Sequence, residues 1–255
     1  MGIEAGSPAR RAEYRSASLR RCDGVGHRLT ASRSRLTLAG EVFVPDVSGA
    51  LWWPAMQTLL VADLHLEKGS AHAARGALLP PYDTARTLAC LEDALARYAP
   101  RRVVALGDSF HDSDAGARIA APDLDRLARL QAQVDWTWIA GNHDPHPPAG
   151  VGGAWLSEAV IGPVALRHEP TYDAEAEIAG HLHPAAKLRQ RGRTLRRRCL
   201  AADKRRVILP AFGAFTGGLN VLDRAFDGLL DRAGFSAWML GASAVHAVSG
   251  RRLIP

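Results

Sequence analysis

The chain has 255 residues but only three cysteines, and Cys22, Cys90 and Cys199 are far apart in the sequence. This number and spacing exclude a disulfide framework and a cysteine zinc cluster, so a reducing cytoplasm is the expected compartment. Long hydrophobic runs are absent too, because none approaches the roughly 18–20 residues that cross a bilayer. An integral membrane protein is therefore excluded, and no membrane partner is expected. The arginine-rich N-terminal segment has no apolar core, so no secretory signal is expected.

Lysine is scarce as well. The chain has three lysines among its 32 basic residues, the rest being arginine, and its net charge is +6. The planar guanidinium group of arginine suits phosphate, but an arginine excess in an alanine-rich chain is equally expected from genome composition, and both explanations stay open. Apolar residues make up 47% and charged residues 23%, which is ordinary for a globular protein with a sizeable core.

Residues 1–33 differ from the rest of the chain. They include seven arginines, three acidic residues and few large apolar residues. No helical or strand periodicity persists there, which predicts a mobile Arg-rich N-terminal tail. A basic arm that holds nucleic acid is the alternative interpretation. A single folded domain is expected over residues 34–255, since no internal repeat or domain boundary is evident.

Short apolar runs separated by proline and glycine predict successive strands. Amphipathic periodicity predicts two helices, Asp83–Arg97 with Asp83 as its N-cap, and Pro122–Gln133. The predicted strands are Leu36–Leu38, Glu41–Val44, Leu51–Trp53, Thr58–Ala62, Arg102–Leu106, Trp136–Ala140, Val164–His168, Ala176–Ala179, Leu188–Leu195, Arg197–Leu200 and Val207–Leu209. Strands that alternate with helices and are followed by more strands predict an α/β layered domain rather than a helical bundle or a β-sandwich.

Clusters of polar residues follow five of the predicted strands. They are Asp63-Leu64-His65, Gly107-Asp108, Gly141-Asn142-His143-Asp144, His168 and Gly180-His181-Leu182-His183. Ligand sites in open α/β sheets lie beyond the carboxyl ends of the strands, so the five clusters should converge on one place. Residues two apart in extended chain point the same way, so Asp63 with His65, and His181 with His183, should each face one metal position.

Carboxylate, amide and imidazole groups together suit a divalent first-row metal. The set holds more ligands than one ion needs. With Asp108 shared, it could bind two ions about 3.5–4 Å apart, the arrangement used for phosphate ester hydrolysis. Each tripeptide alone is a weak signal, because such tripeptides also occur in surface loops. Their joint order, each at a strand end, predicts a catalytic metal site.

This ordered set of motifs resembles the calcineurin-like metallophosphoesterase superfamily. Flanking strings resemble one branch of it, the ligase-associated DNA-damage-response endonucleases. These strings are LLVADLHLEKGS (59–70), RGALLPPYDTARTL (75–88), LGDSFHD (106–112), LRHEP (166–170), GHLHP (180–184) and LPAFGAFTGG (209–218). The resemblance covers about residues 36–250 and implies a four-layer α/β/β/α sandwich with two mixed sheets.

The resemblance also implies a role for each motif residue. Seven side chains become metal ligands in two groups that share a bridging Asp108: Asp63, His65 and His183 for the first ion, and Asn142, His168 and His181 for the second. His143 would stabilise charge at the scissile phosphate or protonate the leaving oxygen, and Asp144 would orient His143. The implied nucleophile is a metal-bridging hydroxide, available near neutral pH because metals lower the pKa of bound water. The implied cofactor is a pair of divalent ions, with manganese as the metal.

One position departs from the superfamily pattern, in which an acidic residue often follows the bridging aspartate as GD-x-x-D. Here His111 takes that position and the acid is Asp112. His111 contacts substrate or supports a metal ligand in one interpretation. In the other it is a loop histidine without a chemical role, and both remain open.

The stretch from residue 187 to residue 206 is strongly basic, with ten basic residues and one acid, Asp203. Arg189, Arg191 and Arg193 alternate, so a strand would place all three on one face, and this face would border the site because the stretch directly follows His183. Such a basic track predicts nucleic-acid contact with salt-dependent affinity. A solvated hairpin is the alternative.

The sequence therefore predicts a two-metal phosphodiesterase. By resemblance it is a DNA endonuclease of a ligase-associated repair pathway, with single-stranded or damaged DNA as substrate and an ATP-dependent DNA ligase and a helicase, encoded nearby, as partners. The alternatives are a phosphatase or cyclic-nucleotide phosphodiesterase on small substrates, or a non-catalytic nucleic-acid-binding protein. The complete ligand set argues against the last of these, and the basic stretch favours a polymer over a small substrate.

Overall fold

A computed structural model of the chain describes residues 12–14, 35–77 and 82–255. The smaller of its two sheets contains β2 (Leu36–Leu38), β3 (Glu41–Pro45), β4 (Leu51–Trp53), β5 (Thr58–Val61), β6 (Arg102–Leu106), β7 (Asp135–Ile139) and β8 (Ala154–Leu156), in that order. The helices are α1 (Lys68–Ala74), α2 (Asp83–Tyr98), α3 (Ala115–Arg118), α4 (Ala121–Gln131) and the 3-10 turns η1 (Arg224–Phe226) and η2 (Gly250–Arg252).

The larger sheet has ten strands among the described residues. They are β1 (Ala12–Tyr14), β9 (Glu158–Ile161), β10 (Val164–Arg167), β11 (Glu177–Ala179), β12 (Pro184–Gln190), β13 (Arg193–Ala202), β14 (Arg206–Ile208), β15 (Leu219–Asn220), β16 (Ser236–Leu240) and β17 (Val245–Ser249). Their order is β1-β9-β10-β11-β14-β13-β12-β15, and β16 pairs with β13 and β17. Both sheets mix parallel and antiparallel pairs, as predicted.

The two sheets share an apolar core. Leu60, Val104 and Ile139 of the smaller sheet meet Leu166 and Val207 of the larger sheet there. The central strands of the smaller sheet are buried on both faces, which explains why they are continuous apolar runs rather than alternating ones. The strands β5, β6 and β7 are parallel neighbours, so their carboxyl ends lie along one edge of the sheet.

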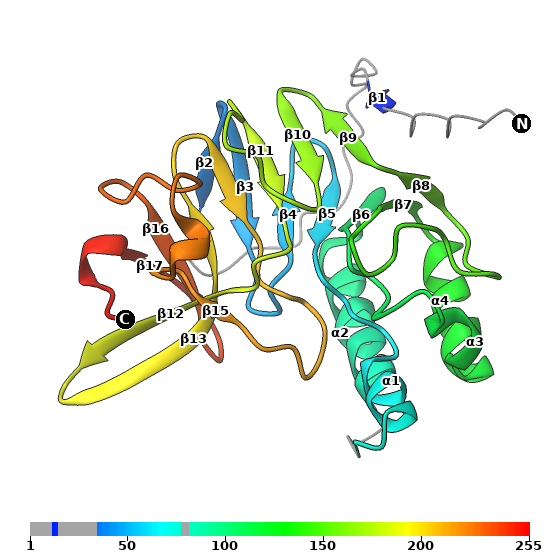
Figure 1. Cartoon of the computed structure of the whole chain (residues 1–255). Helices are drawn as coiled ribbons and strands as arrows, with labels where there is room; N and C mark the ends of the chain where they lie inside the picture. The colour runs from blue at the N-terminus through cyan, green and yellow to red at the C-terminus, as the bar shows by residue number, and fades with distance from the viewer. Residues whose placement is uncertain (1–11, 15–34, 78–81) are drawn as a thin grey trace, which may run out of the picture.

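The four α-helices of the described chain lie together beside the smaller sheet (Figure 1). Leu88, Leu91 and Leu127 form a second core there with the outer face of that sheet. A third core on the outer face of the larger sheet is covered by the segment 221–235, whose one helical turn is η1. The predicted α/β class with two mixed sheets is confirmed, and the outer layer over the larger sheet is loop and 3-10 turn rather than α-helix.

Several predicted boundaries are wrong. Asp83 is not an N-cap, because α2 begins at Asp83 itself and its carboxylate instead accepts a hydrogen bond from the Gly69 amide at 3.0 Å. The predicted strand Leu188–Leu195 is two strands joined by Arg191 and Gly192, which have φ of 48° and 74°. Positive φ at both positions is typical of the two-residue turn that matches the twist of a hairpin.

Residues 1–11 and 15–34 lie outside the described part of the chain. The predicted mobile tail over residues 1–33 and the domain start at residue 34 therefore stay predictions. Within that segment, Ala12–Tyr14 pairs with β9. No helix among the described residues is long and apolar enough to cross a bilayer.

Candidate metal centre

The segments that follow β5, β6, β7, β10 and β11 meet at one place, as the spacing of the polar clusters predicts. A first group of side chains contains Asp63, His65 and His183, whose ligand atoms lie within 4.8 Å of one another. The Nε2 atoms of His65 and His183 are 3.2 Å apart, and His183 Nε2 is 3.4 Å from Asp63 Oδ1. Asp63 is fully buried and His65 nearly so.

A second group contains Asp108, His168 and His181, also within 4.8 Å of one another. His168 Nε2 lies 3.3 Å from Asp108 Oδ1 and 3.1 Å from His181 Nδ1. Asn142 Oδ1 is 2.9 Å from His168 Nε2 and 3.2 Å from His181 Nδ1. The second group touches the first, since the His181 amide donates to both Asp63 carboxylate oxygens at 3.1 and 3.0 Å.

The backbone that carries these side chains is not extended, contrary to the conformation predicted from their alternation. Five of the residues have positive φ: Asp63 (53°), His65 (43°), Asp108 (46°), His181 (71°) and His183 (46°). The extended geometry predicted for residues two apart is therefore wrong. Asp63 and His65 still converge in the first group, but His181 and His183 lie in different groups. Backbone of this kind costs roughly 1–3 kcal/mol per residue and concentrates at functional sites.

Two glycines make the convergence sterically possible. Gly107 has φ of +74°, and a Cβ atom there would lie 2.4 Å from the His168 ring. A Cβ atom on Gly141 would lie 2.2 Å from the Asp108 amide nitrogen. A side chain at either position would push a ligand out of place.

The electrostatics of the site suit cation binding. Burial, together with His183, lowers the pKa of His65 to about 3, so this imidazole is neutral and able to ligate at neutral pH. Burial lowers the pKa of His168, but the hydrogen bond and charge of Asp108 outweigh it and raise the pKa to about 9. A cation bound beside Asp108 competes with that proton, so metal affinity should fall as the pH falls.

The donor set fits divalent metal ions. Two ring nitrogens face one another at 3.2 Å beside a buried carboxylate, and both groups combine carboxylate oxygen with imidazole nitrogen, the ligands of first-row divalent metals. His168 is already oriented for this role, because its Nδ1–H donates to the Leu106 carbonyl at 3.0 Å and leaves Nε2 toward the site.

His143 lies at the rim of the two groups. Its side chain is 41% exposed, and Nε2 is 4.0 Å from Asp108 Oδ2. Its Nδ1–H donates to the His111 carbonyl at 2.7 Å. The His111 ring stacks on the His143 ring, with centroids 5.5 Å apart, and on the His72 ring, at 5.8 Å. Burial, His143 and Lys68 lower the pKa of His111 to about 4, so His111 is a neutral group beside the rim.

The hydrogen bonds of Asp144 go to the backbone, so the role of orienting the His143 ring stays a prediction. Its buried carboxylate accepts three backbone hydrogen bonds, from Ser109 (2.7 Å), Phe110 (3.0 Å) and Gly141 (3.0 Å). These bonds connect the loop after β7 to the loop after β6, and each of those loops carries a ligand candidate. The His111 carbonyl accepts the hydrogen bond of the His143 ring.

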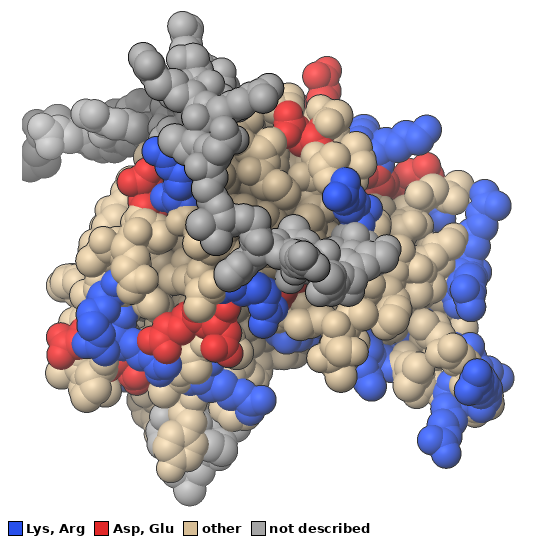
Figure 2. All heavy atoms as spheres, turned by 180° about the vertical axis from the view of Figure 1, so that it is seen from behind, with Lys and Arg blue, Asp and Glu red and all other residues tan. Residues whose placement is uncertain are grey.

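The three arginines of the basic stretch lie on the β12–β13 hairpin, but not on one face of it. Arg189 is paired with Thr194, so Arg193 points to the opposite face, and Arg191 is in the turn. The one-face prediction is wrong because the strand it assumed is interrupted by that turn. All three are exposed. The hairpin extends away from the sheets in Figure 1, and seen from behind in Figure 2 the corner where it projects is basic and carries no acidic side chain.

Glu67 is a buried group that the sequence analysis missed. Its carboxylate accepts hydrogen bonds from Ser70 (2.6 Å) and Thr84 (2.8 Å), and the Thr84 hydroxyl in turn accepts from the Glu67 amide at 2.8 Å. This network fixes the start of α1, directly after the first metal motif, to α2. No spacing in the sequence signals it.

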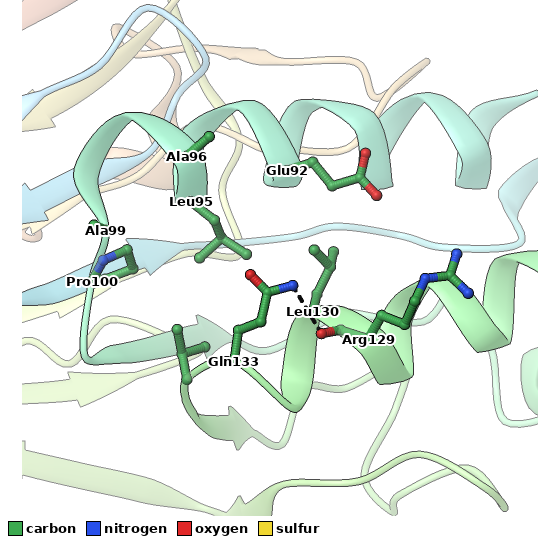
Figure 3. A pocket seen from close by; sticks show the side chains of 9 residues that line it. Glu92, Leu95, Ala96, Ala99, Pro100, Arg129, Leu130 and Gln133 are labelled. Carbon is green, nitrogen blue, oxygen red and sulfur yellow. Dashed lines mark hydrogen bonds between the residues drawn. The ribbon is translucent and has the colours of Figure 1, made fainter.

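A hollow of about 430 Å³ borders the second group and is lined by Asn142, His168, Arg167 and Glu169, among others. Arg167 is held there by Glu158, at 3.0 Å. A separate hollow of about 520 Å³ lies between α2 and α4 (Figure 3) and contains none of the predicted site residues.

Comparisons with known proteins identify the family. The family model described as calcineurin-like phosphoesterase matches residues 56–169. Nuclease MPE of Pseudomonas putida is 30% identical, covers 85% of this chain and 100% of its own, and has a TM-score of 0.66. Yfce, a phosphoesterase from E. coli, is 14% identical, covers 75% of this chain and 98% of its own, and has a TM-score of 0.36. A search of curated proteins found no match. The chain therefore belongs to the calcineurin-like phosphoesterase family and is a metal-dependent phosphoesterase.

Proposed function

We propose that the protein is a two-metal-dependent phosphodiesterase that cleaves DNA as an endonuclease, with single-stranded or damaged DNA as its substrate. The observation that carries the proposal is the pair of adjoining ligand groups with His143 at their rim. The similarity to a nuclease of Pseudomonas putida along that protein's whole length supports the choice of a nucleic acid.

Asp63, His65 and His183 would hold one ion, and a second set, Asn142, His168 and His181, would hold the other, with Asp108 between them. Bound there, two divalent ions would neutralise charge on the phosphate and lower the pKa of water. The neutral state of the His65 imidazole supports its assignment as a ligand. Manganese is the metal proposed on the family resemblance, and the mixed oxygen and nitrogen donors would also accept iron, zinc or cobalt.

His143 would act on the substrate rather than on the metals. Its Nδ1–H is committed to the His111 carbonyl, so Nε2 is the atom free to meet a phosphate or a leaving oxygen. In the imidazolium form, Nε2–H would donate a proton to the departing sugar oxygen as a general acid. His111 would hold the ring by its carbonyl and by stacking, which makes it a positioning residue.

The β12–β13 hairpin would bind the DNA backbone. Arg189 and Arg193 are exposed on opposite faces and Arg191 is at the turn, so they would meet phosphates from different sides rather than as one row. Each neutralised phosphate adds salt-dependent affinity without sequence preference.

The test uses purified protein with manganese on three substrates: circular single-stranded DNA, bis-nitrophenyl phosphate and mono-nitrophenyl phosphate. Cleavage of the circle identifies an endonuclease, because an exonuclease needs an end. Asp108→Ala should abolish activity and lower bound metal, whereas Asp114→Ala, an exposed aspartate outside both ligand groups, should do neither. Efficient monoester hydrolysis without DNA cleavage would replace the nuclease with a phosphatase on small substrates.

The cellular role is proposed on the strings that resemble ligase-associated endonucleases. We place the protein in a cytoplasmic DNA repair pathway with an ATP-dependent DNA ligase and a helicase. Genes for both beside this one, and DNA-damage sensitivity on deletion, are the expected observations. An isolated gene whose deletion leaves damage survival unchanged would contradict the role.

A further inference from the structure

The loop between β14 and β15, residues 209–218, is attached to the backbone of candidate metal ligands at two places. Halfway along it the Gly213 amide donates to the Asp63 carbonyl at 3.2 Å, and directly after its end the Leu219 amide donates to the His183 carbonyl at 2.9 Å. A Cβ atom on Gly213 would lie 2.0 Å from the Leu64 carbonyl oxygen. This loop, the 209–218 loop, therefore lies directly against the backbone of the first metal group.

The middle of the 209–218 loop is fixed as well. The Ala214 amide donates to the Thr87 hydroxyl on α2 at 3.0 Å, and the Thr216 hydroxyl donates to the Gly213 carbonyl at 2.7 Å. Figure 1 shows the loop running between the β12–β13 hairpin and α2. Its conformation is thus determined by contacts on both sides.

Phe215 is held at the centre of this loop. Its side chain is 48% exposed, one of four large hydrophobic residues that the described chain exposes, and its φ is +59°. A bulky residue with positive φ is a strained outlier. Burial does not explain a phenylalanine here, since a polar residue would suit the exposed position. Backbone conformation does not explain it either, since glycine would adopt this φ without strain.

The position of Phe215 relates it to the metal centre. It is two residues beyond Gly213, which contacts the Asp63 carbonyl, and two residues of chain span at most about 7 Å. The hairpin lies on the other side of the loop: an Arg198 guanidinium donates to the Ala211 carbonyl at 2.6 Å, and Arg196 donates to the Gly218 carbonyl. Arg189, Arg196 and Arg198 share one hairpin face by register, so basic groups flank the loop.

We infer that Phe215 is a stacking platform for an unpaired nucleobase of the strand whose phosphate lies at the metal centre. An aromatic face accepts any base, so it selects single strands without selecting sequence. A duplex would offer no free base face there. The inference rests on the proposed nuclease function and assigns Phe215 to a base of the bound strand, whose phosphates would lie on the Arg189 face of the hairpin.

The experiment compares Phe215→Ala, Phe215→Leu and Phe215→Trp on single-stranded DNA, on an abasic oligomer of the same length and on bis-nitrophenyl phosphate. Loss of one base stack should raise the KM for single-stranded DNA by about 5- to 150-fold in the Ala and Leu variants, and the Trp variant should restore it. The abasic oligomer keeps the phosphates but has no bases. The KM of wild type should therefore be higher on it by the same factor, and the KM of the Ala variant should be no higher on it than on normal single-stranded DNA.

Tyr172→Ala is the matched control, because Tyr172 is 69% exposed and its ring lies beside Gly228 instead of the 209–218 loop. It should behave as wild type on all substrates. Equal KM values for wild type and Phe215→Ala on single-stranded DNA would overturn the inference while leaving the nuclease intact. A wild type that hydrolyses the reporter and cleaves no DNA would overturn the nuclease function and this inference with it.

Discussion

Asp144 offers the sharpest test of how the site is built. Its carboxylate, only 1% exposed, accepts hydrogen bonds from the amides of Ser109, Phe110 and Gly141. Asp144→Ala leaves three N–H groups without this partner, of which those of Ser109 and Phe110 are buried and that of Gly141 is half-buried. Each buried group without a partner costs about 1–3 kcal/mol. Allowing for relaxation, we expect a loss of about 3–6 kcal/mol from a total stability of about 5–15 kcal/mol.

Asp144→Asn should be milder for a structural reason. One oxygen of the carboxylate accepts from Gly141 and the other from Ser109 and Phe110. An asparagine can keep one of these acceptors but must turn its NH₂ group toward an N–H donor on the other side. We expect a loss of about 1–3 kcal/mol, so the order of stability is wild type, then Asn, then Ala.

Thermal unfolding in a fixed manganese concentration measures this series. At about 2–4 °C per kcal/mol for a chain of this size, the midpoint should fall by about 6 °C or more in the Ala variant. Bound metal should fall too, and activity on DNA and on bis-nitrophenyl phosphate should drop by the same factor. Asp114→Ala, an exposed aspartate, should leave the midpoint unchanged. A variant with the wild-type midpoint and full metal content that fails on DNA alone would refute this reasoning and return Asp144 to an orienting role for His143.

Three further predictions concern other parts of the molecule. The His143→Ala variant should keep its metals, and its cleavage rate should fall far more on DNA than on bis-nitrophenyl phosphate. A nitrophenolate leaves without a proton whereas a sugar alkoxide needs one, and a general acid raises the rate by about 10²–10⁴-fold. Equal falls in rate on the two substrates would mean that His143 donates no proton. Replacing Arg189, Arg191 and Arg193 together should raise the KM for DNA and flatten its salt dependence, and a parental salt profile would show that the hairpin is only solvated. Burial raises the pKa of Asp46, but hydrogen bonds from Ser48, Tyr98 and Arg97 outweigh it and lower the pKa. Asp46→Asn should therefore lower the free energy of unfolding by about 1–3 kcal/mol at pH 7, and by progressively less as the pH falls through that lowered value. Urea unfolding at pH 7 and in acid measures this difference, and a loss of stability that is the same at both pH values would contradict it.

The sequence was sufficient to predict the location of the site because its strands are continuous apolar runs. Thr58–Ala62 and Arg102–Leu106 are recognisable as buried strands. The polar residues that directly follow them must therefore lie at the ends of these strands. Each observed strand ends within one residue of its predicted end. The convergence of Asp63 and Asp108 then follows from parallel pairing of neighbouring strands.

What the sequence could not supply is the conformation of the backbone beyond the strand ends. Positive φ at Asp63 and His65 has no compositional signal, because glycine, the usual marker, is absent from these positions. The hairpin turn does contain Gly192, a residue typical of turns. Arg189, Arg191 and Arg193 alternate around it, however, and this alternation predicted an uninterrupted strand. Two of the three partners of Asp144, the Ser109 and Phe110 amides, belong to a loop more than 30 residues away. A long-range bond to an amide leaves no trace in side-chain identity.

The strained ligand backbone leads to a last prediction, that the site is formed before metal binds. Each positive φ costs about 1–3 kcal/mol, and backbone hydrogen bonds between the loops offset that cost. The Asp63 amide donates to the Gly107 carbonyl at 3.1 Å, and the His65 amide donates to the Asp108 carbonyl at 2.9 Å. None of these bonds involves a metal.

Chelation should therefore leave the far-ultraviolet circular dichroism spectrum unchanged. Added manganese should increase the free energy of unfolding by mass action, by about 2.7 kcal/mol at a hundred times the dissociation constant. The unfolding midpoint should therefore rise gradually with manganese concentration. This differs from a small metal-folded domain, where the binding free energy is the folding free energy. The protein keeps large apolar cores on both faces of the smaller sheet, and these fix β5 and β6 whether or not the ligands are occupied. Loss of the spectrum on chelation, with recovery on adding manganese, would show that the metals hold the loops and that the interloop hydrogen bonds do not suffice.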